Sequence, residues 1–95
     1  MPAIGVLTME LRIEHAHSLK DKRHLVKSLK EKLRNRHNVS VAEIDHQDLW
    51  QRSVLAAVTV SGDRTQAQKV LQAVEQDAAA QAGPCLVNVT TEWIE

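Results

Sequence analysis

Hydrophobic and polar residues alternate along residues 3–14, the first patterned segment of the chain. One alternate set, which includes Leu7 and Leu11, is apolar throughout, whereas the other begins apolar at Ile4 and Val6 and ends charged. A period of two residues is typical of a strand with one buried face. The pattern therefore predicts an N-terminal β-strand.

Residues 19–36 have helical periodicity. Ser18 and Asp21 form a Ser-x-x-Asp pattern close to a capping box, in which side chains satisfy free backbone N–H groups of the first turn. The apolar residues that follow recur every three or four positions, at Leu25, Val26, Leu29 and Leu33. A helix that begins just after Ser18 is predicted.

Two more strands follow. Residues 39–46 are predicted to form a short and more polar strand in which Ile44 shifts the alternation, and residues 52–61 a strand whose two alternating sets are both apolar. Apolar residues on both faces are typical of a central strand. A second helix, capped by Asp63 or Thr65, is predicted to run up to Gly83, and residues 86–94 are predicted to form the last strand.

The predicted order is βαββαβ. Short connections and the usual handedness of crossovers favour an α+β, ferredoxin-like sandwich, with a four-stranded antiparallel sheet and two helices on one face. The first and third strands are then central. Residues 1–95 are expected to form a single domain, because no linker-like stretch divides them.

Charge is distributed unevenly along the chain. Lys and Arg number 12 and Asp and Glu number 12, yet eight of the bases fall within residues 18–37, opposed only by Asp21 and Glu31. That segment has a net charge of +6 and the remainder −6. Such segregation indicates a surface directed at an anionic partner.

Five of these bases share one stripe of the first predicted helix. At about 100° per residue they fall within an arc of about 80°, beside the apolar arc of about 100°. They are the candidate nucleic-acid-binding residues: Lys20, Arg23, Lys27, Lys30 and Arg34. A merely solvated face, or packing against acidic parts of this chain or of a second subunit, would also account for them. Bases in the first turn oppose the helix dipole, which favours a functional reason for their position.

Three runs carry a resemblance to a known family: Ser-Leu-Lys-Asp-Lys-Arg at 18–23, Asn-Val-Ser-Val-Ala-Glu at 38–43 and Asp-Leu-Trp-Gln-Arg at 48–52. Together they resemble the YlxP-like family of small uncharacterised bacterial proteins. The resemblance implies a ferredoxin-like fold and a cytoplasmic protein often encoded among transcription and translation genes. It supplies no catalytic residue, and it favours RNA or the ribosome as partner.

Two classes of protein that share this fold are disfavoured. RNA-recognition domains stack bases on aromatic residues of the central strands, but the two tryptophans are the only Phe, Trp or Tyr residues and neither lies in those strands. Acylphosphatases need a phosphate-cradling loop after the first strand, and residues 14–18 contain no glycine. Any nucleic-acid contact is therefore expected to be made by the helix, to phosphates.

Trp50 lies in a polar connection between the second and third strands, near Arg52. The two residues are a possible partner anchor, with the indole as a stacking platform. The alternative is a lid over one end of the core. Trp93, near the end of the last strand, is expected to close the core or a subunit interface.

An open sheet face supports an alternative function. The residues expected on the face away from the helices are Ile4, Val6, Leu55 and Ala57, and an apolar patch there would need a cover. A homodimer or larger homo-oligomer, acting as a structural or interaction protein, follows from this hypothesis. It is compatible with RNA binding by the helix.

Candidate catalytic and metal sites are weak. His15 and His17 lack an identifiable third ligand, and Cys85 has no partner that would activate its thiol. A charged edge strand is favoured over a divalent-ion or general-base site for the acidic cluster Glu43, Asp45, His46 and Asp48. We therefore predict no catalytic residue, no metal and no cofactor, and favour a metal- or phosphate-dependent enzyme least.

The location of the protein is expected to be cytoplasmic. The longest apolar stretches, such as residues 54–60 interrupted by Thr59, are too short to span a bilayer, and the N-terminus has no signal-peptide pattern. A single cysteine excludes an internal disulfide and fits a reducing compartment. No membrane partner is predicted.

Overall fold

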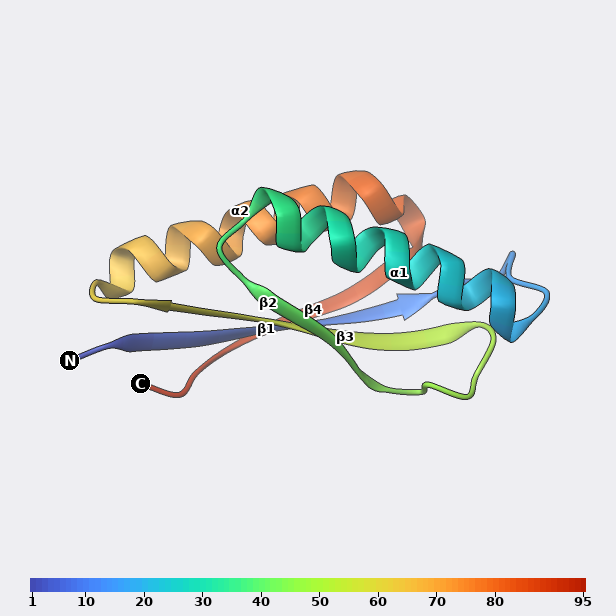
Figure 1. Ribbon diagram of the computed structural model, residues 1–95, viewed down its shortest axis with the longest axis horizontal. Helices are drawn as coiled ribbons and strands as arrows, with labels where there is room; N and C mark the ends of the chain where they lie inside the picture. Colours follow the sequence, from blue (N-terminus) through green and yellow to red (C-terminus); the bar gives the residue numbers. More distant parts are fainter.

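The protein is a two-layer sandwich of helices on a sheet. In the computed structural model, which describes residues 1–95, the elements are β1 (Ala3–Arg12), α1 (Leu19–Arg36), β2 (Ser40–Asp45), β3 (Arg52–Ser61), α2 (Arg64–Ala82), the short 3-10 helix η1 (Gly83–Cys85) and β4 (Leu86–Trp93). The sheet is antiparallel in the order β2-β3-β1-β4, and both helices cover the same face (Figure 1). The ferredoxin-like fold and the central position of the first and third strands are confirmed.

Both helices begin at the predicted type of cap. The Ser18 hydroxyl accepts a hydrogen bond from the Asp21 backbone N–H at 3.1 Å, and the Asp21 carboxylate accepts one from the His17 N–H at 3.2 Å. In α2 the cap is Asp63, whose carboxylate accepts from the Thr65 N–H at 3.0 Å. Neither helix combines the length and hydropathy that a membrane-spanning helix requires.

Trp93 closes one end of the core. Its side chain is half-buried and packs against the buried cluster between the sheet and the helices. This packing depends on Gly5, directly opposite in the sheet, because a Cβ there would lie 2.8 Å from Trp93 Cζ3 and 2.7 Å from Leu71 Cδ1. The guanidinium of Arg64 lies over the indole, 4.4 Å from the ring centroid.

The register of the sheet corrects the predicted open face. Leu55 pairs with Met9, and Ala57 pairs with Leu7. All four side chains are buried in the core that the helices cover. The prediction that Leu55 and Ala57 face away from the helices was therefore wrong.

The open face contains the other alternate set of β3. Ile4 pairs with Val60 and Val6 pairs with Val58, so these β1 residues lie on that face as predicted. Because both sets of β3 are apolar, its own pattern cannot determine which one faces the helices; pairing with β1 does. The β3 residues on the open face are Val54, Ala56, Val58 and Val60.

Candidate nucleic-acid interface

Lys22, one of the eight clustered bases, is a core residue. Its side chain is fully buried, and its ammonium nitrogen lies 2.6 Å from Glu43 Oε2. It also donates hydrogen bonds to the backbone carbonyls of His46 at 2.7 Å and Gln47 at 3.3 Å. The Ser53 hydroxyl donates to the same Glu43 oxygen at 2.6 Å. Lys22 therefore joins the first turn of α1 to the β2–β3 connection and adds nothing to the protein surface.

Two further bases of α1 face α2. Lys32 Nζ donates to Gln81 Oε1 at 3.2 Å, and Arg36 Nη1 lies 3.0 Å from Asp77 Oδ1. His37 Nε2, just beyond the helix, lies 2.8 Å from the other Asp77 oxygen. Partial burial raises the pKa of Asp77, but hydrogen bonds from His37 and Gln81 and the charges of Arg36 and His37 outweigh it, so the pKa lies below its usual value. These contacts pin the helices together near the end of α1.

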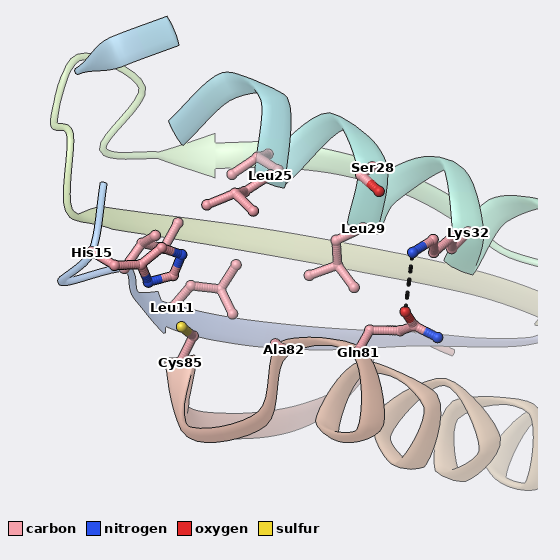
Figure 2. Close-up of a pocket in the computed structure, with 11 residues that line it drawn as sticks. Leu11, His15, Leu25, Ser28, Leu29, Lys32, Gln81, Ala82 and Cys85 are labelled. Atoms are coloured by element: carbon pink, nitrogen blue, oxygen red, sulfur yellow. Dashed lines mark hydrogen bonds between the residues drawn. The ribbon is translucent and has the colours of Figure 1, made fainter. Parts of the chain in front are cut away.

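The helices separate towards the start of α1 and leave a cavity of about 240 Å³ (Figure 2). Leu25, Leu29 and Lys32 line it from α1, and Ala82 and Cys85 line it from the opposite side. Figure 2 shows the Lys32–Gln81 hydrogen bond across the gap between α1 and α2. Leu25, Leu29 and Lys32 therefore lie on the side of α1 that faces α2.

The remaining five bases of α1 lie on its other flank. They are the candidate residues Lys20, Arg23, Lys27, Lys30 and Arg34, which we call the basic stripe. Four are exposed and Lys30 is half-buried, and none makes an ion pair or a side-chain hydrogen bond within the chain. By helical angle they lie across the buried residues from Lys32 and Arg36, on the side of the edge strand β2. Their positive charge is thus unpaired and open to solvent.

Trp50 is not a lid over the core. Its side chain is 52% exposed, its neighbour Leu49 is 44% exposed, and neither belongs to the core cluster. Arg52, at the start of β3, is also exposed. The two proposed anchor residues are therefore both accessible to a partner.

The acidic cluster of the β2 region does not converge on one point. Glu43 turns inward to Lys22, whereas the Asp45 carboxylate accepts a hydrogen bond from the His46 N–H at 2.8 Å. β2 is an edge strand, as the favoured interpretation requires. No three or more His, Cys, Asp or Glu side chains lie close enough together to hold a metal ion.

The histidines of the first loop also have separate surroundings. His15 lines the cavity between the helices, and the backbone N–H of His17 belongs to the α1 cap. Cys85, in η1, is half-buried. Sequence reasoning missed the inward role of Lys22, and the only signal for it was its angular position among the apolar residues of α1.

Comparison with known proteins gives a family and a fold. A family model described as protein of unknown function (DUF503) matches residues 4–91. The uncharacterized protein YlxP of Bacillus subtilis strain 168 is 42% identical over 71 residues, which are 75% of this chain and 77% of that protein.

Solved structures resemble the chain at much lower identity. Bacillus subtilis YxeP, described as a dinuclear metal-binding peptidase of the M20 family, has a TM-score of 0.60 at 9% identity over 98% of this chain and 26% of its own. Rv0793 of Mycobacterium tuberculosis has a TM-score of 0.56 at 17% identity over 100% of this chain and 94% of its own. These likenesses show the fold alone.

Proposed function

The chain belongs to the DUF503 family of proteins of unknown function and is similar to Bacillus subtilis YlxP. We propose that it is a non-enzymatic RNA-binding protein. The basic stripe of α1 is the contact surface. The proposed partner is structured RNA, and ribosomal RNA is the favoured candidate.

The observation that carries this proposal is the division of the eight clustered bases. Three are engaged by the fold itself, through Glu43, Gln81 and Asp77. The five that remain without partners share one flank of a single helix and extend over 14 residue steps, from Lys20 to Arg34, or roughly 21 Å at the helical rise. Lysine and arginine in such a row bind phosphates through charge-assisted hydrogen bonds.

The mode of binding follows from the same geometry. The central strands β1 and β3 carry no aromatic residue, so bases have no stacking surface on the sheet. Contacts of α1 with phosphates carry little sequence information. The proposed complex is therefore sensitive to salt and has little sequence preference.

Neutralising part of the basic stripe tests the proposal. In Arg23→Gln/Lys27→Gln/Lys30→Gln three of five phosphate contacts are lost, and the affinity for a labelled RNA hairpin at about 50 mM salt should fall at least ~100-fold. Fluorescence anisotropy measures the affinity, and circular dichroism checks that α1 remains folded.

A matched variant controls for net charge. Gln68→Glu/Gln72→Glu/Gln76→Glu changes the charge by the same amount at exposed positions of α2 and should change the affinity much less. If both triple variants lost RNA affinity equally, the loss would follow from net charge and not from the basic stripe. An RNA hairpin that does not bind the wild-type protein at low salt would disprove the proposal.

The open sheet face supports a second candidate function, the assembly of two copies into a homodimer. Val58 is 36% exposed and Val60 is 58% exposed, beside Ile4 and Val6 on the neighbouring strand. Covering such a face removes apolar surface from water. Sedimentation at micromolar concentration should show a dimer that Val58→Lys/Val60→Lys converts to a monomer; a wild-type monomer would contradict it.

A further inference from the structure

Two arginines face each other at one end of the open sheet face. Arg12 of β1 and Arg52 of β3 are directly opposite in the register. Both are exposed, and neither makes an ion pair or a side-chain hydrogen bond within the chain. Like charges in this arrangement destabilise a sheet. A bound anion would relieve the repulsion.

Trp50 lies beside the arginine pair. A cleft of about 720 Å³, which we call the Trp50 cleft, is lined by Arg12, Glu14, Asp48, Leu49, Trp50, Gln51 and Arg52. The cleft thus combines an accessible aromatic ring with two guanidinium groups. Nucleobases stack on aromatic rings, and guanidinium groups bind phosphates with two parallel hydrogen bonds.

The connection that carries Trp50 is held in place on both sides. On one side Lys22 donates to the carbonyls of His46 and Gln47. On the other, Gln51 Nε2 donates to the carbonyls of Glu14 at 3.1 Å and Ala16 at 3.3 Å. The Ile13 N–H also donates to the Gln51 carbonyl at 2.8 Å. A platform fixed before binding loses less conformational entropy when a ligand stacks on it.

Lys22 also places the Trp50 cleft close to the basic stripe. It is one residue away from Arg23 and two from Lys20 in the first turn of α1, and it bonds directly to the connection that leads to Trp50. Figure 1 shows the start of α1 and the β2–β3 connection at the same end of the molecule. One RNA molecule can therefore reach both surfaces.

We propose that the Trp50 cleft binds an unpaired nucleotide of RNA, with the base stacked on Trp50 and a phosphate held between Arg12 and Arg52. The inference rests on the proposed function and specifies the class of RNA that is bound: RNA in which a single-stranded segment adjoins a structured one. Glu14 and Asp48 offer acceptors for base amino groups or for a 2′-hydroxyl.

The two surfaces differ in how their binding responds to salt. Glu14 and Asp48 balance the charges of Arg12 and Arg52, so the Trp50 cleft has no net charge of its own. Stacking and short-range hydrogen bonds then supply most of the binding there. Because the cleft holds one phosphate, its slope of log K against log salt should be about −0.7, whereas the basic stripe should give about −3.5 to −4.5.

Tryptophan fluorescence tests the inference on the full chain. A single-stranded hexamer of uridine should quench the emission, and Trp50→Leu should remove the quenching and lower the affinity for the hexamer roughly tenfold or more. Arg12→Gln/Arg52→Gln should lower it comparably, whereas Ile44→Ala, which alters an exposed apolar residue outside the cleft, should leave it unchanged. Trp50→Leu should bind a blunt-ended RNA duplex, which contains no unpaired nucleotide, as the wild type does.

The outcomes separate the inference from the proposed function. Hairpin binding by the basic stripe without hexamer quenching, or a Trp50→Leu protein that binds the hexamer normally, would overturn the inference alone. Hexamer binding that is lost in Trp50→Leu but retained in the triple neutralisation of the basic stripe would support the Trp50 cleft. If neither RNA binds the wild-type protein, both proposals fail.

Discussion

Replacing Lys22 by methionine tests whether this base belongs to the core. Methionine keeps most of the length of the side chain but removes the ammonium group. The change leaves the Glu43 carboxylate without its ion pair and removes the lysine donor from the His46 and Gln47 carbonyls, of which the His46 carbonyl still accepts from the Leu49 N–H at 3.1 Å. The Ser53 hydroxyl still donates to Glu43 at 2.6 Å in the native geometry.

The expected loss of stability is large for a protein of this size. Removing one partner of a buried ion pair costs about 3–5 kcal/mol. Glu43 keeps 16% of its side chain exposed and can be partly hydrated, so the lower end, about 3 kcal/mol, is expected. A small domain has a total stability of roughly 5–15 kcal/mol. The melting temperature should therefore fall by roughly 12–24 °C.

A double-mutant cycle with Glu43→Gln isolates the interaction. Thermal and urea unfolding, followed by circular dichroism, give the free energies of unfolding. The double variant no longer contains an unpaired carboxylate and should recover part of the loss caused by Lys22→Met. A loss below about 1 kcal/mol for Lys22→Met, or no coupling with Glu43→Gln, would refute a structural role for the lysine.

Two other positions allow sharp tests. Gly5→Ala should destabilise the fold by roughly 1–3 kcal/mol and change the emission of Trp93, because the new Cβ overlaps packed side chains. Gly62→Ala is the matched control, because a Cβ there has no atom within 4 Å. Equal free energies of unfolding for the two variants would contradict the close packing at Gly5. Asp77→Asn should lower the melting temperature at neutral pH. Because the folded pKa of Asp77 lies below the ordinary value of 3.8, its contribution is present above that value and is lost as the pH falls through the folded pKa. The difference in melting temperature between Asp77→Asn and the wild type should therefore become smaller in acid. A difference that does not change with pH would contradict the pairing of Asp77 with Arg36 and His37.

Much of the fold could be predicted from local patterns. The spacing of apolar residues and the Ser18 cap predicted α1 over the same residues that the structure contains, and the doubly apolar run predicted β3 as a central strand. The break in alternation at Ile44 corresponds to the irregular pairing between Glu43 and Asp45. Such features depend on residues that are close together along the chain, so they can be predicted from the sequence.

Features that depend on tertiary contacts were not predictable. The face on which Leu55 lies follows from its pairing with Met9 and not from the pattern of β3 itself. The burial of Lys22 requires Glu43 and a carbonyl that lie more than 20 residues away. The pairing of Arg12 with Arg52 likewise depends on the register between β1 and β3, for which neither strand alone contains a signal. The basic stripe was predictable because one helix carries all its members.

The salt dependence of RNA binding tests the central claim most directly. If all five bases of the stripe contact phosphates, the logarithm of the association constant for an RNA hairpin should fall against the logarithm of the salt concentration with a slope of about −3.5 to −4.5. In the variant Arg23→Gln/Lys27→Gln/Lys30→Gln, two contacts remain and the slope should be about −1.4 to −1.8. A slope near zero in the wild type, or the same slope in both proteins, would contradict RNA binding by the basic stripe.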